Sequence, residues 1–324
     1  MTDPGRGLVS VVVTSYNHAE FLPQRMESLL AQTYRPLEII VVDDRSSDDS
    51  VKVLRRWETD PLVRIVALDA NLGVAGASNR GAALARGEYL MFAECDDFDA
   101  PGHIERLVRA LESNSAGVAF CRSALVDSRG AVVGDDFAGR EPAFRAHCAA
   151  DALIPSPLMR RFLLRACVVP NMSAALMRKA AFDAAGGASS AYRLCLDWDL
   201  WGRLARENDF YYVAETLSSF RSHPTTARST FDLAFQLGEI FDVLRDAAGA
   251  MELTARDRFK FRLGLGLIWA GYFRADPGAW LRGFPRAAAA ASRRDPFAVL
   301  FLAMAAGAKL LGIRYSLVDR DFRV

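Results

Sequence analysis

The sequence carries almost no excess of charge of either sign. Its 324 residues include 40 Lys and Arg against 39 Asp and Glu, which gives a formal net charge of +1. Proteins that bind nucleic acid usually carry a strong basic excess, so we expect no nucleic-acid partner. The five cysteines are scattered with no C-x-x-C pair, so neither a disulfide framework nor a zinc knuckle is indicated. A reducing compartment fits this pattern best.

Long apolar runs are also missing. The longest apolar tracts, 263–273 and 297–308, are shorter than the roughly 20 residues that a membrane-spanning helix needs. Residues 1–7 are polar and do not look like a secretory signal. We therefore predict no transmembrane segment and a cytoplasmic location, with the inner face of the membrane as the alternative.

The chain is long enough to bury a large core, because 51% of its 324 residues are hydrophobic. Apolar runs of strand length alternate with helical patterns through the first part of the chain. From residue 232 onward only helical patterns remain. We therefore predict an α/β domain over residues 1–228 and a helical C-terminal extension over residues 229–324.

The most informative stretch is an apolar run, residues 89–93, that is followed by acids. The run does not alternate with polar residues, which is typical of a central, parallel strand covered on both faces. Glu94, Asp96, Asp97 and Asp99 follow within six positions, at the end of the strand where open α/β sheets bind ligands. A cation such as Mg²⁺ or Mn²⁺, bound with nucleotide phosphates, relieves the repulsion among them. The alternative is a solvated acidic turn.

Two earlier strands also end in polar turns. Residues 8–14 lead into Tyr16 and Asn17, where the tyrosine is placed either to stack on a base or to pack in the core. We expect Asn17 to cap the helix that follows. Residues 38–42 lead into Asp44, whose carboxylate is placed to accept a hydrogen bond from a base imide or a ribose hydroxyl.

The connections after these strands follow the same pattern. Ser46 or Ser47 is expected to cap a helix over 49–57, and a strand over 63–68 comes next. The small-residue segment 71–79 lacks the G-x-G-x-x-G spacing of a dinucleotide fingerprint. Because strand–helix–strand crossovers are right-handed, the polar turns are predicted to gather at one edge of the sheet.

The second half of the α/β region is less regular. Residues 134–166 contain three prolines and suggest a variable surface segment, and residues 168–177 predict a strand. Asp197 and Asp199 open a helix, about 200° apart around its axis, so at most one of them faces a shared pocket. Stabilisation of the helix dipole explains either acid equally well. His223 lies in a polar loop, where we do not expect a buried structural role.

Beyond residue 232 the sequence predicts helices at 232–248, 254–273, 277–291 and 296–311. Basic and aromatic residues are interleaved there: Arg282, Arg286, Arg293, Arg294, Lys309 and Arg314 with Trp280, Phe284, Phe297 and Phe301. Such a surface suits peripheral contact with anionic lipid. The alternative is a helical appendage that packs on the domain or on a second copy in a homodimer.

Together these motifs resemble the family 2 glycosyltransferases of the GT-A fold, over residues 8 to 225. The matching segments occur in the family's order: 9–17, 40–44, 79–89, 94–97, 196–201 and 220–223. Each segment alone is a weak signal, and the ordered set is a strong one. The resemblance implies a Rossmann-like, mostly parallel central sheet flanked by helices.

The resemblance also implies an activity, namely inverting, metal-dependent, hexosyltransferase-like transfer in bacterial polysaccharide or glycoconjugate biosynthesis. The donor is a nucleoside-diphosphate sugar, and the acceptor is a saccharide, a lipid-linked or another hydroxyl. The implied donor-binding residues are Thr14, Tyr16, Asn17, Asp44, Asn79 and Asp96. Asp96, Asp97 and His223 are assigned to Mg²⁺ or Mn²⁺, and Asp197, in preference to Asp199, to the catalytic base.

Four positions depart from the family's pattern. Arg45 stands where glycine is usual, Ser78 where arginine is common, and Leu196 where glutamate commonly precedes the base; Glu94, which replaces aspartate, keeps a carboxylate. The first three favour an alternative, a nucleotide-sugar-binding module with impaired catalysis. A nucleotidyltransferase of similar topology would need a glycine-rich basic first loop, and residues 15–18 read Ser-Tyr-Asn-His instead.

Overall fold

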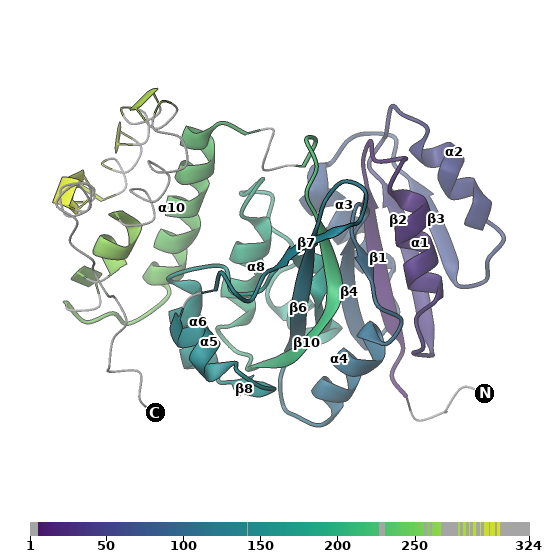
Figure 1. Ribbon diagram of the computed structural model, residues 1–324, viewed down its shortest axis with the longest axis horizontal. Helices are drawn as coiled ribbons and strands as arrows, with labels where there is room; N and C mark the ends of the chain where they lie inside the picture. Colours follow the sequence, from purple (N-terminus) through teal and green to yellow (C-terminus); the bar gives the residue numbers. More distant parts are fainter. Residues whose placement is uncertain are drawn as a thin grey trace. The chain divides into compact units, whose positions relative to one another are not determined.

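The computed structural model describes residues 6–140, 142–226 and 231–255, together with scattered residues between 258 and 304. The chain divides into two compact units: residues 1–160 with 167–223, and residues 161–166 with 224–324. All of the described strands belong to the first unit (Figure 1). The candidate site lies in that unit as well.

The first unit opens with repeated strand–helix pairs. The strands are β1 (Val9–Ser15), β2 (Leu37–Asp43), β3 (Val63–Ala67) and β4 (Tyr89–Glu94). Between them lie α1 (Leu22–Leu30), α2 (Ser50–Leu54) with the 3-10 turn η1 (Arg55–Trp57), and α3 (Gly73–Leu84). The four strands were predictable to within one residue at either end, because each is an apolar run that stops at a polar turn.

Six further strands complete the sheet. They are β5 (Phe98–Asp99), β6 (Val118–Val126), β7 (Val132–Asp135), β8 (Ala152–Ile154), β9 (Ala175–Arg178) and β10 (Phe210–Arg221). The strand order is β3-β2-β1-β4-β9-β6-β10-β5, with β7 beside β6 and β8 beside β10. β1 lies parallel to β2 and β4, whereas β9 runs antiparallel between β4 and β6. The acidic strand β4 is therefore central, as expected, but it is parallel to only one of its two neighbours.

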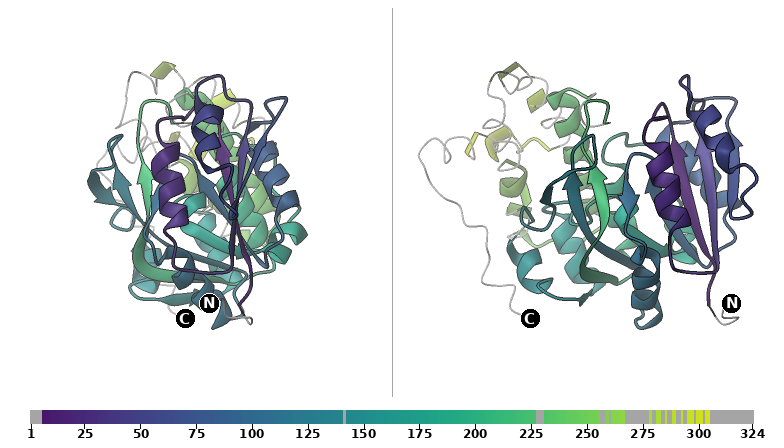
Figure 2. Two further views of the ribbon diagram at one scale, coloured as in Figure 1. Left: turned by 90° about the vertical axis from the view of Figure 1, so that its right-hand side faces the viewer. Right: turned by 45° about the vertical axis from the view of Figure 1, so that its right-hand side comes forward.

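Helices cover both faces of this sheet (Figure 2). Val11 and Val13 of β1 share one core cluster with Leu22 of α1 and with Leu107 of α4 (His103–Glu112). The residue between the two valines, Val12, faces α3. A Cβ atom on Gly81 of α3 would lie only 2.2 Å from Val12 Cγ1, so this close approach requires glycine.

The segment 134–166 is structured, and the expectation of a variable surface segment was wrong. It contains α5 (Pro142–His147), β8 and α6 (Ser156–Leu163). Phe144, Ile154 and Met159 of these elements are buried. Elements this short show no clear period in the sequence, so their burial could not be inferred from spacing.

One further expectation was partly right. The strand predicted over 168–177 begins only at Ala175, after the 3-10 turn η2 (Met172–Ala174). The segment 210–221 forms one strand, β10, with register shifts near its middle. A turn at 127–130 connects β6 to β7, with Gly130 at a φ of 85°. Helix α7 (Lys179–Ala184) follows β9, and α8 (Leu196–Leu204) is the predicted helix that Asp197 and Asp199 open.

The described part of the second unit is mainly α10 (Leu233–Gly249), which agrees with the predicted helix 232–248. Asp232 caps it, because its side chain accepts a hydrogen bond of 2.8 Å from the Phe235 amide. Only parts of the other predicted helices are described: residues 255, 258–259 and 261–266 of the predicted helix 254–273 are helical. Most of the interleaved basic and aromatic residues lie outside the described residues. Within the part of the chain that is described, no helix has the length and apolar character needed to cross a membrane.

Candidate active site

The polar turns predicted to gather at one edge of the sheet do lie together. Thr14, at the end of β1, is paired with Val42 of β2 on one side and with Glu94 of β4 on the other. Ser15 is paired with Asp43. The turn residues that follow these strands are therefore neighbours, although up to about eighty positions separate them in the sequence.

At the end of β2 the acids are satisfied by the loop itself. Asp43 is buried and accepts hydrogen bonds from the Ser46 amide (2.8 Å), the Ser46 hydroxyl (2.7 Å) and the Ser15 hydroxyl (3.0 Å). Asp44 is buried as well and accepts a bond of 2.7 Å from the Leu72 amide. Burial raises the pKa of Asp44 above its ordinary value despite the hydrogen bonds from the Leu72 and Gly73 amides.

The turn after β1 is joined to this loop. Asn17 has a left-handed φ of 54°, and its side-chain oxygen accepts hydrogen bonds from the Ser47 amide (2.7 Å) and hydroxyl (3.2 Å). Its own amide donates to the Ser46 hydroxyl at 2.9 Å. The expectation that Asn17 caps a helix was therefore wrong, since α1 begins at Leu22. The expected helix cap at Ser46 or Ser47 was also wrong. Helix α2 begins at Ser50, and the two serine hydroxyls bond to Asp43 and Asn17 at the junction between the loops.

Two other predicted donor-binding residues lie in different surroundings. Tyr16 is 48% exposed beside the strand ends, so it is available for stacking and is not a core residue. Asn79, on α3, exchanges two hydrogen bonds of 2.8 Å with the backbone of Ala188, one in each direction. Its amide holds the turn after α7 in place, and its assignment to donor binding stays a prediction.

At the end of β4 the acids lie close to one another. Oε2 of Glu94 is buried, and no described residue gives it a hydrogen bond. Burial and the charges of Asp97, Asp96 and Asp197 raise the pKa of Glu94 well above its ordinary value, and only Arg25 opposes the rise. The Asp197 charge acts on Glu94 across about a hundred residues of sequence. The predicted base therefore lies near the predicted metal acids.

Asp96 lies against histidines. Its Oδ2 atom is 2.9 Å from Nε2 of His223, which is buried, contrary to the expectation for a polar loop. The His223 ring packs on the rings of His18 and Phe21, with centroids 5.1 and 4.6 Å away. Burial opposes ionisation of Asp96, but the hydrogen bond with His223 and the nearby His18 outweigh it, so its pKa lies below the ordinary value.

The Asp97 side chain points into the protein interior and is buried. Oδ2 accepts a hydrogen bond of 2.8 Å from the Ser173 hydroxyl, and Oδ1 accepts one of 3.0 Å from the Arg221 amide. Burial and the neighbouring Asp96 charge raise the pKa of Asp97 to about 7. Asp96 and His223 are thus brought together as predicted, whereas Asp97 is held separately from them.

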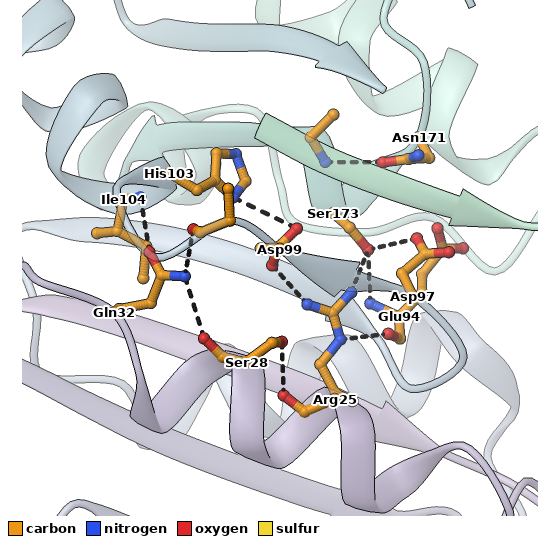
Figure 3. Close-up of polar contacts among 12 residues, drawn as sticks. Arg25, Ser28, Gln32, Glu94, Asp97, Asp99, His103, Ile104, Asn171 and Ser173 are labelled. Carbon is orange, nitrogen blue, oxygen red and sulfur yellow. Dashed lines mark hydrogen bonds and ion pairs between the residues drawn. The ribbon is translucent and has the colours of Figure 1, made fainter. Parts of the chain in front are cut away.

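Two buried arginines hold the acidic turn in place, and neither was singled out from the sequence. Arg25, fully buried on α1, donates to the Glu94 carbonyl (2.8 Å), the Asp99 carboxylate (2.5 Å) and the Ser173 hydroxyl (3.2 Å), as Figure 3 shows. Arg221, at the end of β10, donates to the Asp96 carbonyl at 2.6 Å. These contacts span up to 148 residues of sequence, so no local pattern reveals them.

Arg25 belongs to a buried group of charges that also includes Asp99 and His103. Despite burial, the Arg25 and His103 charges lower the pKa of Asp99 to about 2. Burial works against protonation of His103, but Cys121 and Asp99 raise its pKa to about 10. The acid that the sequence grouped with the metal cluster, Asp99, therefore belongs to this internal charge pair.

The two acids at the start of α8 differ in their partners. Asp199 accepts two hydrogen bonds from the Arg203 guanidinium, at 2.9 and 2.8 Å. Oδ1 of Asp197 accepts a bond of 2.7 Å from the Trp198 amide, and Oδ2 lies 4.0 Å from Cys167 Sγ. Only Asp197 is among the groups whose charge raises the pKa of Glu94.

The site's donor atoms suit a divalent cation. Glu94 offers a buried carboxylate oxygen with no donor among the described residues, and Asp96 offers a carboxylate beside two imidazoles. Carboxylate oxygen and imidazole nitrogen are ordinary ligands of Mn²⁺, and Mg²⁺ accepts the carboxylates. Both oxygens of Asp97 are already engaged, so its fit as a direct ligand is poorer.

The sheet, with acidic turns at the ends of β2 and β4 and a further acid opening α8, defines a glycosyltransferase domain of the GT-A type. The family model described as glycosyl transferase family 2 matches residues 10–186, which is more than half of the chain. The chain belongs to that family.

Sequence relatives agree with this assignment over part of their length. A segment of 111 residues is 37% identical to the succinoglycan biosynthesis protein ExoO of Rhizobium meliloti, covering 34% of this chain and 32% of that protein. The chain spans about a third of the length of the first curated relatives that it matches.

Solved structures share the fold at low sequence identity. S. aureus TarS 1-349 in complex with UDP-GlcNAc has a TM-score of 0.66 and 14% identity, covering 95% of this chain and 93% of that one. The mannosyltransferase PcManGT from Pyrobaculum calidifontis, in complex with GDP-Man and Mn²⁺, has a TM-score of 0.58 and 17% identity, covering 97% and 90%. The predicted GT-A architecture is confirmed by these neighbours.

Proposed function

We propose that this protein is an inverting glycosyltransferase that moves a sugar from a nucleoside-diphosphate donor to an acceptor hydroxyl. One observation carries the proposal: Glu94, Asp96 and Asp97 lie together at the end of β4, and Asp197 is close enough for its charge to raise the pKa of Glu94. So many acids in one place favour a cationic partner and leave one carboxylate available as a base. The succinoglycan role of one relative supports a place in polysaccharide or glycoconjugate synthesis.

We assign the metal to Asp96 and to His223, which lies 2.9 Å from it. Glu94 lies near the Asp96 charge and offers a further carboxylate. A bound Mg²⁺ or Mn²⁺ would neutralise charge on the diphosphate leaving group as a Lewis acid. Asp97, fixed by Ser173 and the Arg221 backbone, contributes charge from deeper in the protein. The Mn²⁺ in the complex of PcManGT supports this choice of ion.

The donor's nucleoside is assigned to the side of the site formed by β1 and β2. Tyr16 is exposed and can stack on a base, which is typically worth about 1 to 3 kcal/mol. Asp44 lies beside the 71–73 turn, where its carboxylate can accept a further hydrogen bond from a base or ribose. Thr14 and Asn17 border the same region.

Asp197 is assigned as the base. As the new glycosidic bond forms, the proton of the acceptor hydroxyl moves to the Asp197 carboxylate, and the nucleoside diphosphate leaves. Asp199 is excluded from this assignment because Arg203 holds it in a two-point ion pair. Asp197 lies near the acidic turn of β4, because its charge is one of those that raise the pKa of Glu94.

The test compares Asp197→Asn with Asp199→Asn in donor-binding and transfer assays. The donor is first identified by thermal-shift screening of UDP, GDP, dTDP and CDP sugars with Mn²⁺. Asp197→Asn should lower kcat by about 10² to 10⁴-fold and leave donor binding nearly unchanged. Asp199→Asn should lower stability, with a much smaller effect on kcat. Equal turnover in wild type and Asp197→Asn would show that this base assignment is wrong.

The second candidate is a donor-binding module that has lost turnover, and Arg45 is the observation that favours it. Arg45 holds a left-handed φ of 63°, a conformation in which the family's usual glycine is unstrained. Donor transfer or hydrolysis with Mn²⁺ that stops on addition of EDTA would exclude this alternative. Donor binding without any turnover would support it.

For the second unit we propose peripheral membrane contact, with a homodimer as the competing role. The basic and aromatic composition of residues 280–314 supports the first. Flotation with anionic and neutral vesicles, together with sedimentation of the full chain, separates the two. Binding that requires anionic lipid supports membrane contact, and a dimer that ignores lipid supports the alternative.

A further inference from the structure

A thiol lies inside the acidic turn and is not used by the proposed reaction. Cys95, between Glu94 and Asp96, is 5% exposed, and its Sγ atom is 3.3 Å from Nδ1 of His18. A ring nitrogen of His18, Sγ of Cys95 and a carboxylate oxygen of Asp96 all lie within 4.8 Å of one another. Among the described residues, this is the one such group of three histidine, cysteine or acidic side chains.

The spacing of these atoms is close to that of a zinc site. With bonds of about 2.3 Å to sulfur and 2.0 to 2.1 Å to nitrogen or oxygen, the donors of a tetrahedral zinc ion lie about 3.3 to 3.7 Å apart. A sulfur–nitrogen pair on such an ion lies about 3.5 to 3.6 Å apart, slightly more than the observed Nδ1–Sγ distance of 3.3 Å. All three donor atoms lie within 4.8 Å of one another, so modest side-chain rotations would bring them to the separations of a zinc site.

We infer that His18, Cys95 and Asp96 form a binding site for Zn²⁺, or another thiophilic divalent ion, with water as the fourth ligand. A thiolate donor selects zinc over magnesium and manganese, which prefer oxygen. On binding, the Cys95 thiol releases its proton to solvent and the sulfur bonds to the ion. His223, 2.9 Å from Asp96 Oδ2, holds the carboxylate in orientation from outside the site.

This site shares Asp96 with the metal of the proposed reaction. Zinc held by Cys95 and a donor-bound Mn²⁺ would both draw on that carboxylate, so zinc should inhibit by competition. This second statement rests on the proposed function, whereas the zinc site itself does not. The inference thus adds sensitivity to zinc to a centre that would otherwise bind hard cations.

A second cysteine–histidine pair provides a matched control. Cys121 Sγ is 3.4 Å from Nε2 of His103, and both residues are fully buried. The nearest carboxylate, that of Asp99, lies on the opposite ring nitrogen, 3.4 Å from Nδ1. The three donors therefore point to two different places and cannot converge on one ion.

The site is tested by Co²⁺ titration of the full chain without nucleotide, followed by ultraviolet–visible absorption. We expect a thiolate-to-metal charge-transfer band and the strong visible bands of a four-coordinate ion. Cys95→Ser should remove the charge-transfer band, and Cys121→Ser should keep it. Zn²⁺ affinity, measured against a chromogenic chelator, should fall at least about tenfold in Cys95→Ser and in His18→Asn. Circular dichroism checks that each variant is folded.

Two results would contradict the zinc site. Weak bands of a six-coordinate ion in wild type, or equal zinc affinity in wild type and folded His18→Asn, would overturn the inference. Competition is measured by the electron paramagnetic resonance signal of Mn²⁺ released on addition of Zn²⁺ in the presence of nucleoside diphosphate. A thiolate band without any nucleoside-diphosphate binding would refute the proposed function and leave the zinc site standing.

Discussion

The ends of β2 and β4 both carry consecutive acids at the same edge of the sheet, but the two turns treat them differently. At β2, Asp43 and Asp44 are buried and accept hydrogen bonds from nearby amides and hydroxyls. At β4, Glu94 has a buried oxygen with no donor among the described residues. The nearby Asp97 has a pKa of about 7.

The turns after β2 and β4 use acidic residues in two different ways. A carboxylate that receives hydrogen bonds from its own loop fixes the shape of that loop. A carboxylate crowded by its own kind is unfavourable until a cation arrives. The β2 acids therefore shape the loop beside the nucleoside, and the β4 acids provide the charge for metal and diphosphate. Removing individual groups from either turn tests this distinction.

The largest effect is expected from Arg25→Met, which removes the buried cation behind the β4 turn. Asp99 then loses its closest partner, and the Glu94 carbonyl and Ser173 hydroxyl each lose a donor. Breaking a buried pair in this way typically costs about 3 to 5 kcal/mol in the free energy of unfolding. Urea unfolding measures the change.

Arg86→Met is the control for that experiment, because Arg86 forms an exposed pair with Glu38. Its loss should cost no more than about 1 kcal/mol. Equal losses in the two variants would mean that the β4 turn does not depend on a buried cation.

Next comes the kinetic contrast between Asp96→Asn and Asp44→Asn. Loss of the proposed metal ligand should lower kcat by about a hundredfold or more, since Lewis-acid stabilisation contributes several kcal/mol. Asp44→Asn should mainly raise the KM for donor, because the base contact is the same in ground and transition states. Steady-state kinetics with saturating Mn²⁺ measures both. A larger kcat loss in Asp44→Asn would reverse the roles assigned to the two turns.

The sequence predicted both acidic turns and the strands before them. The contacts that it did not predict have physical reasons. The strands β1, β2 and β4 are unalternated apolar runs, and short-range rules locate such runs and the acids behind them. The cap predicted at Asn17 failed because its left-handed φ lets the side chain reach the neighbouring loop. Arg25 and Ser173 were missed because tertiary packing, and no local period, brings them to the acidic turn.

A further effect is expected in the pH dependence of stability. The pKa of Asp97 rises from 3.8 to about 7 on folding, so the folded state binds more protons than the unfolded state across that interval. The free energy of unfolding should therefore fall as pH rises from about 4 to 7, by at most about 1.4 kcal/mol per unit from this group.

Asp97→Asn should flatten that fall, because the asparagine cannot titrate. Urea unfolding of both proteins at a series of pH values measures the difference, with the Asp99 and His103 contributions present in each. Parallel curves for the two proteins would contradict the raised pKa and, with it, the crowding of acids at β4.

The smallest effect is expected from Asn17→Ala at the β2 side. It removes the hydrogen bonds from Ser47 in an exposed loop and should cost about 0.5 to 1.5 kcal/mol of stability. The affinity for metal should stay unchanged, because the β4 acids are untouched. Thermal unfolding and Mn²⁺ titration test the two statements, and a weakened metal site would mean that the turns are coupled.

The most direct test of the central claim is calorimetric titration of UDP and GDP into the protein, with and without Mn²⁺, in wild type and Asp96→Asn. If the β4 acids form the cation-dependent half of the site, one nucleotide binds wild type in the presence of Mn²⁺, and binding is lost without the ion or without Asp96. Nucleotide binding of equal affinity under all of these conditions would contradict the account.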